Sequence, residues 1–307
     1  MKTDRAMKKI IVTGAAGIIG AILTELLLKN GYQIYAVVRP DSLHNHRIPV
    51  HENIVQIPLL MKEIIDLPRY IPASCDAMIH LAWSNARNDF AAQYASFRYT
   101  TQAVDVATAL GCQRFLGIGS QAEYGWQQKL TTEDTVLNPV TPYGAFKAAA
   151  SHVTRIRAAQ NRIEWIWGRI FSVYGGYEPT TSLISYLLQT LKQGDVPLMT
   201  EATQQWDYLY VQDAAQAVIS LLEKGQSGQI YNIANGDIHP LRYFTEQLRE
   251  LIAPDIKIHY GAKQIVTAFS LIPSVKKIQK DTGWKATMGF LDGIKAMLAN
   301  KIPATLS

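Results

Sequence analysis

The segment TGAAGIIG, residues 13–20, restricts the fold of this 307-residue chain more than any other stretch. Its three glycines, Gly14, Gly17 and Gly20, follow an apolar run that predicts a buried strand and open an apolar-striped helix. Gly14 permits a tight turn, Gly17 lets the backbone approach a pyrophosphate, and Gly20 allows close packing of helix on strand. Because phosphates bind the unpaired N–H groups and positive dipole of a helix N-terminus, the segment predicts a dinucleotide site.

Short apolar runs alternate with longer helical patterns through the first half of the chain. The expected strands are 8–14, 33–39, 53–59, 76–82, 114–120 and 163–171. The expected helices are 18–31, about 90–111, and one that includes residue 143 and ends at about 161. Strands that alternate with helices of ten or more residues form βαβ units around a parallel sheet. We therefore predict an α/β fold with a doubly wound parallel sheet, a Rossmann fold.

The alternation of strands and helices becomes less regular beyond the sixth expected strand. Expected there are a strand that runs into a helix at 206–225, a strand at 229–236, and helices at about 183–194, 240–252, 274–282 and 288–300. We expect residues 1–171, with returning segments at about 205–235, to form the nucleotide-binding domain. Segments at about 172–204 and 236–307 then form a smaller C-terminal α/β substrate-binding portion, which caps one edge of the sheet without an independent core.

Composition excludes several classes of protein. The chain is 48% apolar and 18% charged, as in ordinary globular proteins. It lacks an uncharged apolar run of transmembrane length and a signal-peptide core, so we expect no membrane association. Its two cysteines, Cys75 and Cys112, have no metal-ligand spacing, which predicts a cytoplasmic protein without disulfides or a metal site. The net charge of +5 comes without a Lys/Arg-rich run with interleaved aromatics, so we expect no nucleic-acid partner.

The end of the second expected strand, AVVRPDS, bears on the choice of cofactor. A carboxylate there binds a free ribose 2′-hydroxyl, whereas an arginine accommodates a 2′-phosphate. Arg39 occupies this position, and Asp41 comes two residues later, beyond a turn at Pro40. Arg47, and less so His44, is placed to reinforce a phosphate site. The segment favours NADP(H) and leaves NAD(H) open.

The segment TPYGAFKAAA (141–150) places Tyr143 and Lys147 four residues apart, on one face of a helix. Two interpretations stay open at this point. A surface helix packs its tyrosine and exposes its lysine to solvent, whereas an active site directs a phenol and an ammonium into the same space.

A wider set of motifs resembles the extended short-chain dehydrogenase/reductase family, the NAD(P)-dependent nucleotide-sugar epimerases, dehydratases and reductases. The resemblance covers nearly the whole chain and is closest to 4-ketoreductases of the CDP-abequose-synthase type. Its motifs are TGAAGIIG, HLAW (80–83), GSQAEYG (119–125), YGAFK (143–147), RIFSVYGG (169–176), WDYLYVQDAA (206–215) and TGW (282–284).

The resemblance implies a catalytic group of Ser120, Tyr143 and Lys147. Tyr143 would be the general acid/base, Ser120 would polarise the carbonyl, and Lys147 would hold the nicotinamide ribose. Since a nearby ammonium favours a phenolate, we expect Lys147 to lower the pKa of Tyr143 from its usual value of about 10. The expected cofactor-binding residues are Gly14, Gly17, Ile18, Ile19, Gly20, Arg39, Leu81, Ala82, Tyr143 and Lys147. The expected substrate residues are Trp83, Gln121, Glu123, Ser172 and Trp206.

Several positions depart from the family pattern. Gln121 and Ala122 replace the dehydratase signature after Ser120, which disfavours 4,6-dehydration and favours a pocket or supporting role for Glu123 over that of an elimination acid. Trp206 stands where the family often has a phosphate-binding arginine, and Ser172 where asparagine is frequent. The substrate pyrophosphate is then expected to meet Lys263 or Arg242, unless the substrate is a smaller ketone.

The sequence therefore predicts an NADP(H)-dependent reductase of a 4-keto nucleotide sugar. The alternatives are an NAD-dependent nucleotide-sugar 4-epimerase, which Arg39 disfavours, and a non-catalytic NADP-binding sensor. We also expect a homodimer through the helices at about 90–110 and 143–160. The first of these helices carries an apolar stripe that could equally be intramolecular core, formed by Phe90, Tyr94, Phe97, Thr101 and Val104.

Overall fold

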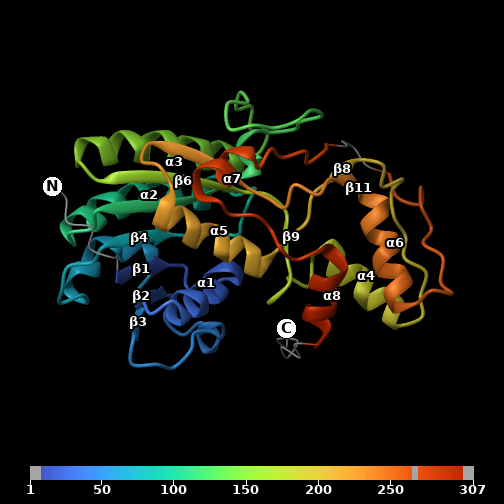
Figure 1. Cartoon of the computed structure of the whole chain (residues 1–307), viewed down its shortest axis with the longest axis horizontal. Coiled ribbons are helices and arrows are strands. Elements are labelled where there is room, and N and C mark those ends of the chain that lie inside the picture. The colour runs from blue at the N-terminus through green and yellow to red at the C-terminus, as the bar shows by residue number, and fades with distance from the viewer. Residues whose placement is uncertain (1–7, 265–268, 300–307) are drawn as a thin grey trace.

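The computed structural model describes residues 8–264 and 269–299, which form a parallel sheet of seven strands (Figure 1). The strand order is β3-β2-β1-β4-β5-β6-β10, which confirms the predicted doubly wound fold. The strands are β1 (Lys9–Thr13), β2 (Gln33–Val38), β3 (Ile54–Pro58), β4 (Ala77–His80), β5 (Arg114–Ser120), β6 (Glu164–Ile170) and β10 (Gln229–Ile233). The order reverses between β1 and β4, the point at which such sheets bind ligands.

Helices cover both faces of this sheet. One face packs against α1 (Ile18–Lys29), α5 (Val211–Lys224) and α7 (Lys276–Thr282). The opposite face packs against α2 (Phe90–Ala109), α3 (Pro142–Gln160) and the 3₁₀ segment η2 (Met61–Arg69). Buried aliphatic side chains fill both layers, as expected for a sheet buried on two faces.

The remaining elements lie beyond the α1 and α5 side of the sheet, at the right of Figure 1. They are β7 (Val173–Tyr174), α4 (Leu183–Lys192), β8 (Gln205–Trp206), β9 (Leu209–Tyr210), β11 (His239–Pro240), α6 (Leu241–Ile252) and α8 (Phe290–Ala299). Aromatic and aliphatic side chains from several of these elements form a buried cluster that includes Tyr174, Leu187, Tyr208, Phe244, Phe290 and Ile294. This cluster also contains Val211 of α5 and packs against Ile18, Ile19 and Ile22 of α1, so it is continuous with the nucleotide-binding part of the chain.

Most expected elements are present within a few residues of their expected bounds. The three short 3₁₀ segments, η1 (Asn45–Arg47), η2 and η3 (Gln121–Glu123), were not expected. The η2 sequence MKEIIDLPR contains Pro68. Because proline normally ends helices, the sequence pattern did not predict a helical segment there. Within the described ranges, no helix is both long enough and apolar enough to cross a membrane.

Candidate active site

A cavity of about 970 Å³ opens at the carboxyl edge of the sheet. It is bordered by the ends of β1, β2, β4 and β5, by the start of α3, and by the loop that follows β7. All of the expected cofactor-binding residues line this cavity, and so do Ser120 and Trp83. The structure thus gathers residues from many separate segments of the sequence around one space.

The glycine-rich turn is shaped to admit phosphates. Gly14 has φ +70°, and a Cβ added there would lie 2.8 Å from the backbone nitrogen of Ala82. A Cβ added to Gly20 would lie 2.2 Å from the carbonyl oxygen of Gly14, so the helix approaches the turn at a distance that only glycine allows. Gly17 is the N-cap of α1, and no described side chain caps the helix there. The backbone N–H groups of the first turn of α1 therefore lack a side-chain cap, and such groups suit a dinucleotide pyrophosphate.

The catalytic group expected from the sequence meets at the inner end of the cavity. Tyr143 lies in the first turn of α3, where Thr141 caps the helix by accepting a hydrogen bond from the Gly144 N–H at 3.1 Å. Ser120 ends β5 and lines the cavity beside Tyr143, and its hydroxyl tends to lower the pKa of the Tyr143 phenol. One turn further along α3, the Lys147 Nζ donates to the Ile118 carbonyl oxygen at 2.5 Å.

Lys147 is deeply buried, with 4% of its surface exposed. Its Nζ lies 4.0 Å from the centre of the Trp83 ring, a distance typical of a cation–π contact. Burial lowers the pKa of Lys147 to about 7, with Glu123 opposing this shift and Arg87 adding to it. These contacts fix the position of Lys147. They contradict the interpretation in which the lysine is a solvated surface charge.

Comparison with known proteins places this site in a family. Residues 10–234 match the sequence profile described as the NAD dependent epimerase/dehydratase family. The chain belongs to this family. The match confirms the resemblance predicted from the motifs, and with it an NAD(P)-dependent enzyme of the extended short-chain dehydrogenase/reductase type.

Individual relatives are distant but cover the whole length. UDP-glucose 4-epimerase of Corynebacterium glutamicum is 23% identical over 90% of each chain. CDP-abequose synthase of Salmonella muenchen is 23% identical over 96% of this chain and 98% of the relative. Among solved structures, UDP-glucuronic acid 4-epimerase of Bacillus cereus in complex with NAD has a TM-score of 0.83 at 21% identity, over 95% of this chain and 97% of that one. The structural match shows the shared fold.

The end of the cavity near Arg39 is where we expect the adenosine ribose. Its residues differ in detail from the expectation that Arg47 and His44 reinforce a phosphate site there. Arg39, Ser42 and His44 line the cavity, and the Arg39 carbonyl accepts a hydrogen bond from Asn45 at 2.9 Å. Arg47 does not line it, because its guanidinium lies 4.0 Å from the centre of the Tyr177 ring. Burial, together with the neighbouring arginines, lowers the pKa of His44 and keeps its imidazole neutral. Arg39 is thus the cation at this end of the cavity.

The cation that faces the Tyr143 ring is Arg87, which the sequence analysis missed. The Arg87 Cζ lies 4.7 Å from the ring centre, and Arg87 also lines the cavity. Burial raises the pKa of Tyr143, and the opposing influences are Arg87 and the Ser120 hydroxyl. The expectation that Lys147 lowers this pKa is therefore not met, since its ammonium is turned to Ile118 and Trp83. An arginine in the loop after β4 could have been flagged, because such loops carry ligand contacts.

The expected substrate residues are only partly brought together. Trp83 lines the cavity, whereas Gln121, Ser172 and Trp206 lie outside its lining. The Trp206 indole N–H donates to the Ser172 hydroxyl at 3.3 Å, so these two residues form a pair of their own. Glu123 is fully buried, which rules out direct contact with a substrate in this structure.

The two cations expected to meet a substrate pyrophosphate are also engaged elsewhere. Arg242 pairs with Glu201 at 3.1 Å, and the Lys263 Nζ lies 4.5 Å from the centre of the Tyr186 ring. Neither lines the cavity. Arg87, by contrast, both lies against the Tyr143 ring and lines the cavity.

Proposed function

We propose that this protein is an NADP(H)-dependent reductase that acts on the 4-keto group of a nucleotide-activated sugar. The observation that carries the proposal is the single cavity that holds Ser120, Tyr143 and Lys147 at one end and Arg39 at the other. The similarity to CDP-abequose synthase over nearly the whole chain supports a nucleotide-sugar substrate.

The residues of the cavity suit reduction of a carbonyl. A bound nicotinamide cofactor supplies the hydride. Tyr143 donates its phenolic proton to the carbonyl oxygen as negative charge develops there, since general acids act over hydrogen-bonding distance. Ser120 donates a second hydrogen bond to that oxygen. Lys147 would hold the nicotinamide ribose. The raised pKa of Tyr143 keeps the phenol protonated at neutral pH, as a general acid requires.

Arg39 supports NADP(H) over NAD(H). Its guanidinium stands at the end of β2, carries a permanent charge and offers the paired N–H donors that a 2′-phosphate accepts. Ser42 adds a hydroxyl on the same stretch of the cavity wall.

An NAD-dependent nucleotide-sugar 4-epimerase is the second candidate. It is favoured by the solved structures of this fold that carry NAD, among them the Bacillus cereus epimerase. An epimerase would use the same three catalytic residues in both directions. A non-catalytic NADP-binding sensor would not need Ser120, Tyr143 and Lys147 together in one cavity.

The test is the identity of the nucleotide released when the purified protein is denatured, followed by turnover of 4-keto nucleotide sugars with NADPH. Empty protein or partial NADP(H), together with NADPH oxidation that depends on the keto sugar, is the expected result. Stoichiometric NAD and interconversion of 4-epimers without net cofactor oxidation would establish the epimerase. Nucleotide binding without turnover of either kind would leave the sensor.

We also propose that the chain forms a homodimer through α2 and α3. Phe90 and Tyr94 are 69% and 51% exposed, and both rings contact Phe146 of α3. Val104, which belongs to the same stripe, is fully buried core. An aromatic surface that two adjacent helices share is typical of an interface core. Light scattering should give twice the chain mass, and Phe90→Glu should shift it toward the monomer.

The proposal extends to two further features. The nucleotide-binding domain is assigned to residues 1–171 and about 205–235, and the substrate-binding portion to about 172–204 and 236–307. The protein is assigned to the cytoplasm, in keeping with Cys75 and Cys112, which are buried free thiols.

A further inference from the structure

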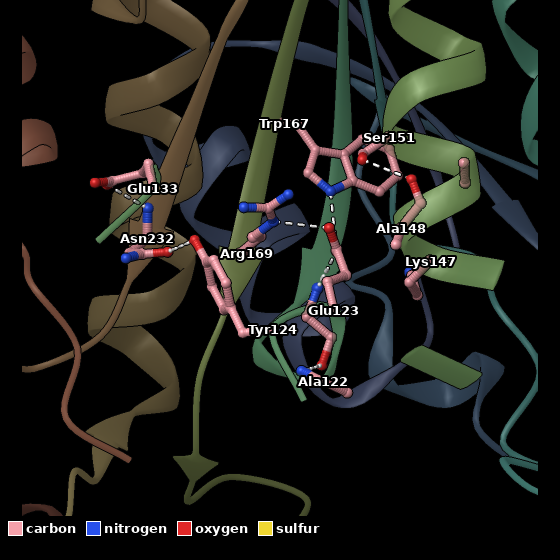
Figure 2. A network of polar contacts seen from close by, with 12 residues as sticks. Ala122, Glu123, Tyr124, Glu133, Lys147, Ala148, Ser151, Trp167, Arg169 and Asn232 are labelled. Carbon is pink, nitrogen blue, oxygen red and sulfur yellow. Dashed lines mark hydrogen bonds and ion pairs between the residues drawn. The ribbon is translucent and has the colours of Figure 1, made fainter. Parts of the chain in front are cut away.

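A buried carboxylate, that of Glu123, lies between Arg169 and Trp167 (Figure 2) and three residues after Ser120. Glu123 closes the 3₁₀ turn η3 and is fully buried. Its Oε1 accepts hydrogen bonds from the Ser120 backbone N–H at 2.8 Å and from the Trp167 indole N–H at 3.0 Å. Its Oε2 accepts from the Arg169 Nε at 2.7 Å, and the Arg169 side chain is 2% exposed. The carboxylate therefore links β5 to β6 at the strand ends that carry the site.

The surrounding sequence makes room for this arrangement. A Cβ added to Gly119 would lie 2.2 Å from both the Glu123 Oε1 and the Trp167 Nε1, so a glycine is needed beside the carboxylate. The Arg169 guanidinium lies 4.5 Å from the centre of the Tyr124 ring, which packs it from another side. The Arg169 Nη1 has no hydrogen-bond partner among the described residues.

Stability alone does not account for this pair. Desolvation of two buried charges offsets most of their attraction, so a buried ion pair is weak evidence for a stabilising role. A pair of apolar side chains would fill the same space at lower cost, whereas a carboxylate adds charge close to the catalytic groups.

Glu123 and Lys147 meet at the Trp167 ring. The Glu123 Oε1 accepts from its indole N–H at 3.0 Å, and the Lys147 Nζ lies 6.0 Å from the ring centre. Figure 2 shows the Glu123 carboxylate with Arg169 on one side and the α3 backbone that bears Lys147 on the other. The charged or titratable groups that act on Lys147 are Glu123 and Arg87, and of these Glu123 favours the ammonium. His80, which also lies near Lys147, is kept neutral by burial, which lowers its pKa to about 3. The groups around Glu123 itself are Arg169, Tyr124, Tyr143 and Lys147.

We propose that Glu123 is a positioning residue of the active site, which fixes the Ser120 backbone and favours the ammonium of Lys147. Arg169 pairs with this carboxylate, and Trp167 fixes its orientation. The proposal rests on the proposed function only in taking Ser120, Tyr143 and Lys147 as the catalytic group.

The test compares Glu123→Gln with the wild type in the binding of NADP⁺ and NAD⁺, measured by protein fluorescence between about pH 6 and 9. Glutamine retains an oxygen acceptor for the Ser120 N–H and removes the charge. Affinity that depends on the Lys147 ammonium should fall on the alkaline side, and in Glu123→Gln this fall should move to lower pH by about one unit or more. A nucleotide affinity that is lower by the same factor at every pH would show a structural role only and overturn the proposal.

The matched control is Glu164→Gln. Glu164 pairs with Arg114 across the same two strands, β5 and β6, but at their opposite ends, with N···O 2.6 Å. This variant loses an inter-strand carboxylate without touching the site, so its pH profile should match that of the wild type. A shift as large as in Glu123→Gln would overturn the proposal.

A double variant separates the effect of the lost charge from an effect of misfolding. Glu123→Gln leaves the Arg169 charge unpaired, which destabilises a buried site, whereas Glu123→Gln with Arg169→Met removes both charges. The alkaline fall should lie at lower pH in the double variant too, and an unshifted fall there contradicts the proposal. The readout needs no substrate. Failure to turn over 4-keto nucleotide sugars would therefore refute the proposed function and leave this result standing.

Discussion

The substitution Lys147→Met replaces a buried ammonium with an unbranched apolar side chain. Lys147 is 4% exposed, and its Nζ donates a hydrogen bond to the Ile118 carbonyl oxygen. Burial lowers its pKa from 10.5 to about 7. A shift of that size means that the Lys147 amine takes up a proton far less readily in the folded protein than in the unfolded chain.

The magnitude follows from the shift. Since one pKa unit corresponds to ~1.36 kcal/mol, the charged Lys147 costs about 5 kcal/mol of folding free energy. Methionine avoids this cost but leaves the Ile118 carbonyl without its donor, at about 1–3 kcal/mol. The variant should therefore be more stable than the wild type by roughly 2–4 kcal/mol near neutral pH.

The pH dependence gives the sign of the effect. The folded-state pKa lies below the unfolded one, so the unfolded chain binds more protons between about pH 7 and 10.5. The cost of the charge is fully present below about pH 7, and it decreases as the pH rises toward 10.5. The stability advantage of Lys147→Met should shrink over the same window.

Urea denaturation of both proteins at about pH 6.5 and about pH 9 measures this difference. Lys192→Met, at an exposed lysine of α4, is the control and should change stability little at either pH. Under the proposed function the variant should also lose turnover, because Lys147 is the residue that would hold the nicotinamide ribose. A Lys147→Met protein that is less stable than the wild type at pH 6.5, or whose advantage does not depend on pH, would refute the reasoning.

Three further predictions concern the same cavity. Tyr143→Phe should retain nucleotide affinity and lower kcat by a factor of about 10²–10⁴, since it removes the general acid; kinetics near the wild-type values would contradict that role. Arg39→Ala should weaken NADP⁺ binding about 10–100-fold and NAD⁺ binding much less, as measured by titration of both nucleotides, and equal losses would argue against a 2′-phosphate site. Gly20→Ala should abolish nucleotide binding in a protein that still folds or prevent folding, because its Cβ would meet the Gly14 carbonyl at 2.2 Å; unchanged binding in a folded protein would show that the turn adjusts.

The cofactor half of the molecule could be predicted from the sequence because its signals are local. The three glycines sit within seven residues, and the tyrosine and lysine share one helix face, so short-range geometry suffices. Glu123 and Arg169 are 46 residues apart, on η3 and β6. The sequence around each residue does not indicate that the two form a pair. The members of the aromatic cluster around Tyr208 and Phe244 could not be predicted for the same reason, since they come from many short elements.

The direction of the reaction can be argued from how charge is distributed around Tyr143. An enzyme that begins by removing a proton needs the phenolate, whereas one that reduces a ketone needs the phenol. Here burial raises the pKa of Tyr143, the nearby cation Arg87 opposes that shift from an exposed position, and the Glu123 carboxylate adds to it. Because exposed charges are screened by solvent and buried ones are not, the balance favours the protonated phenol. This charge arrangement supports the proposal of a reductase, which gives up this proton, over that of an epimerase, which must first take one.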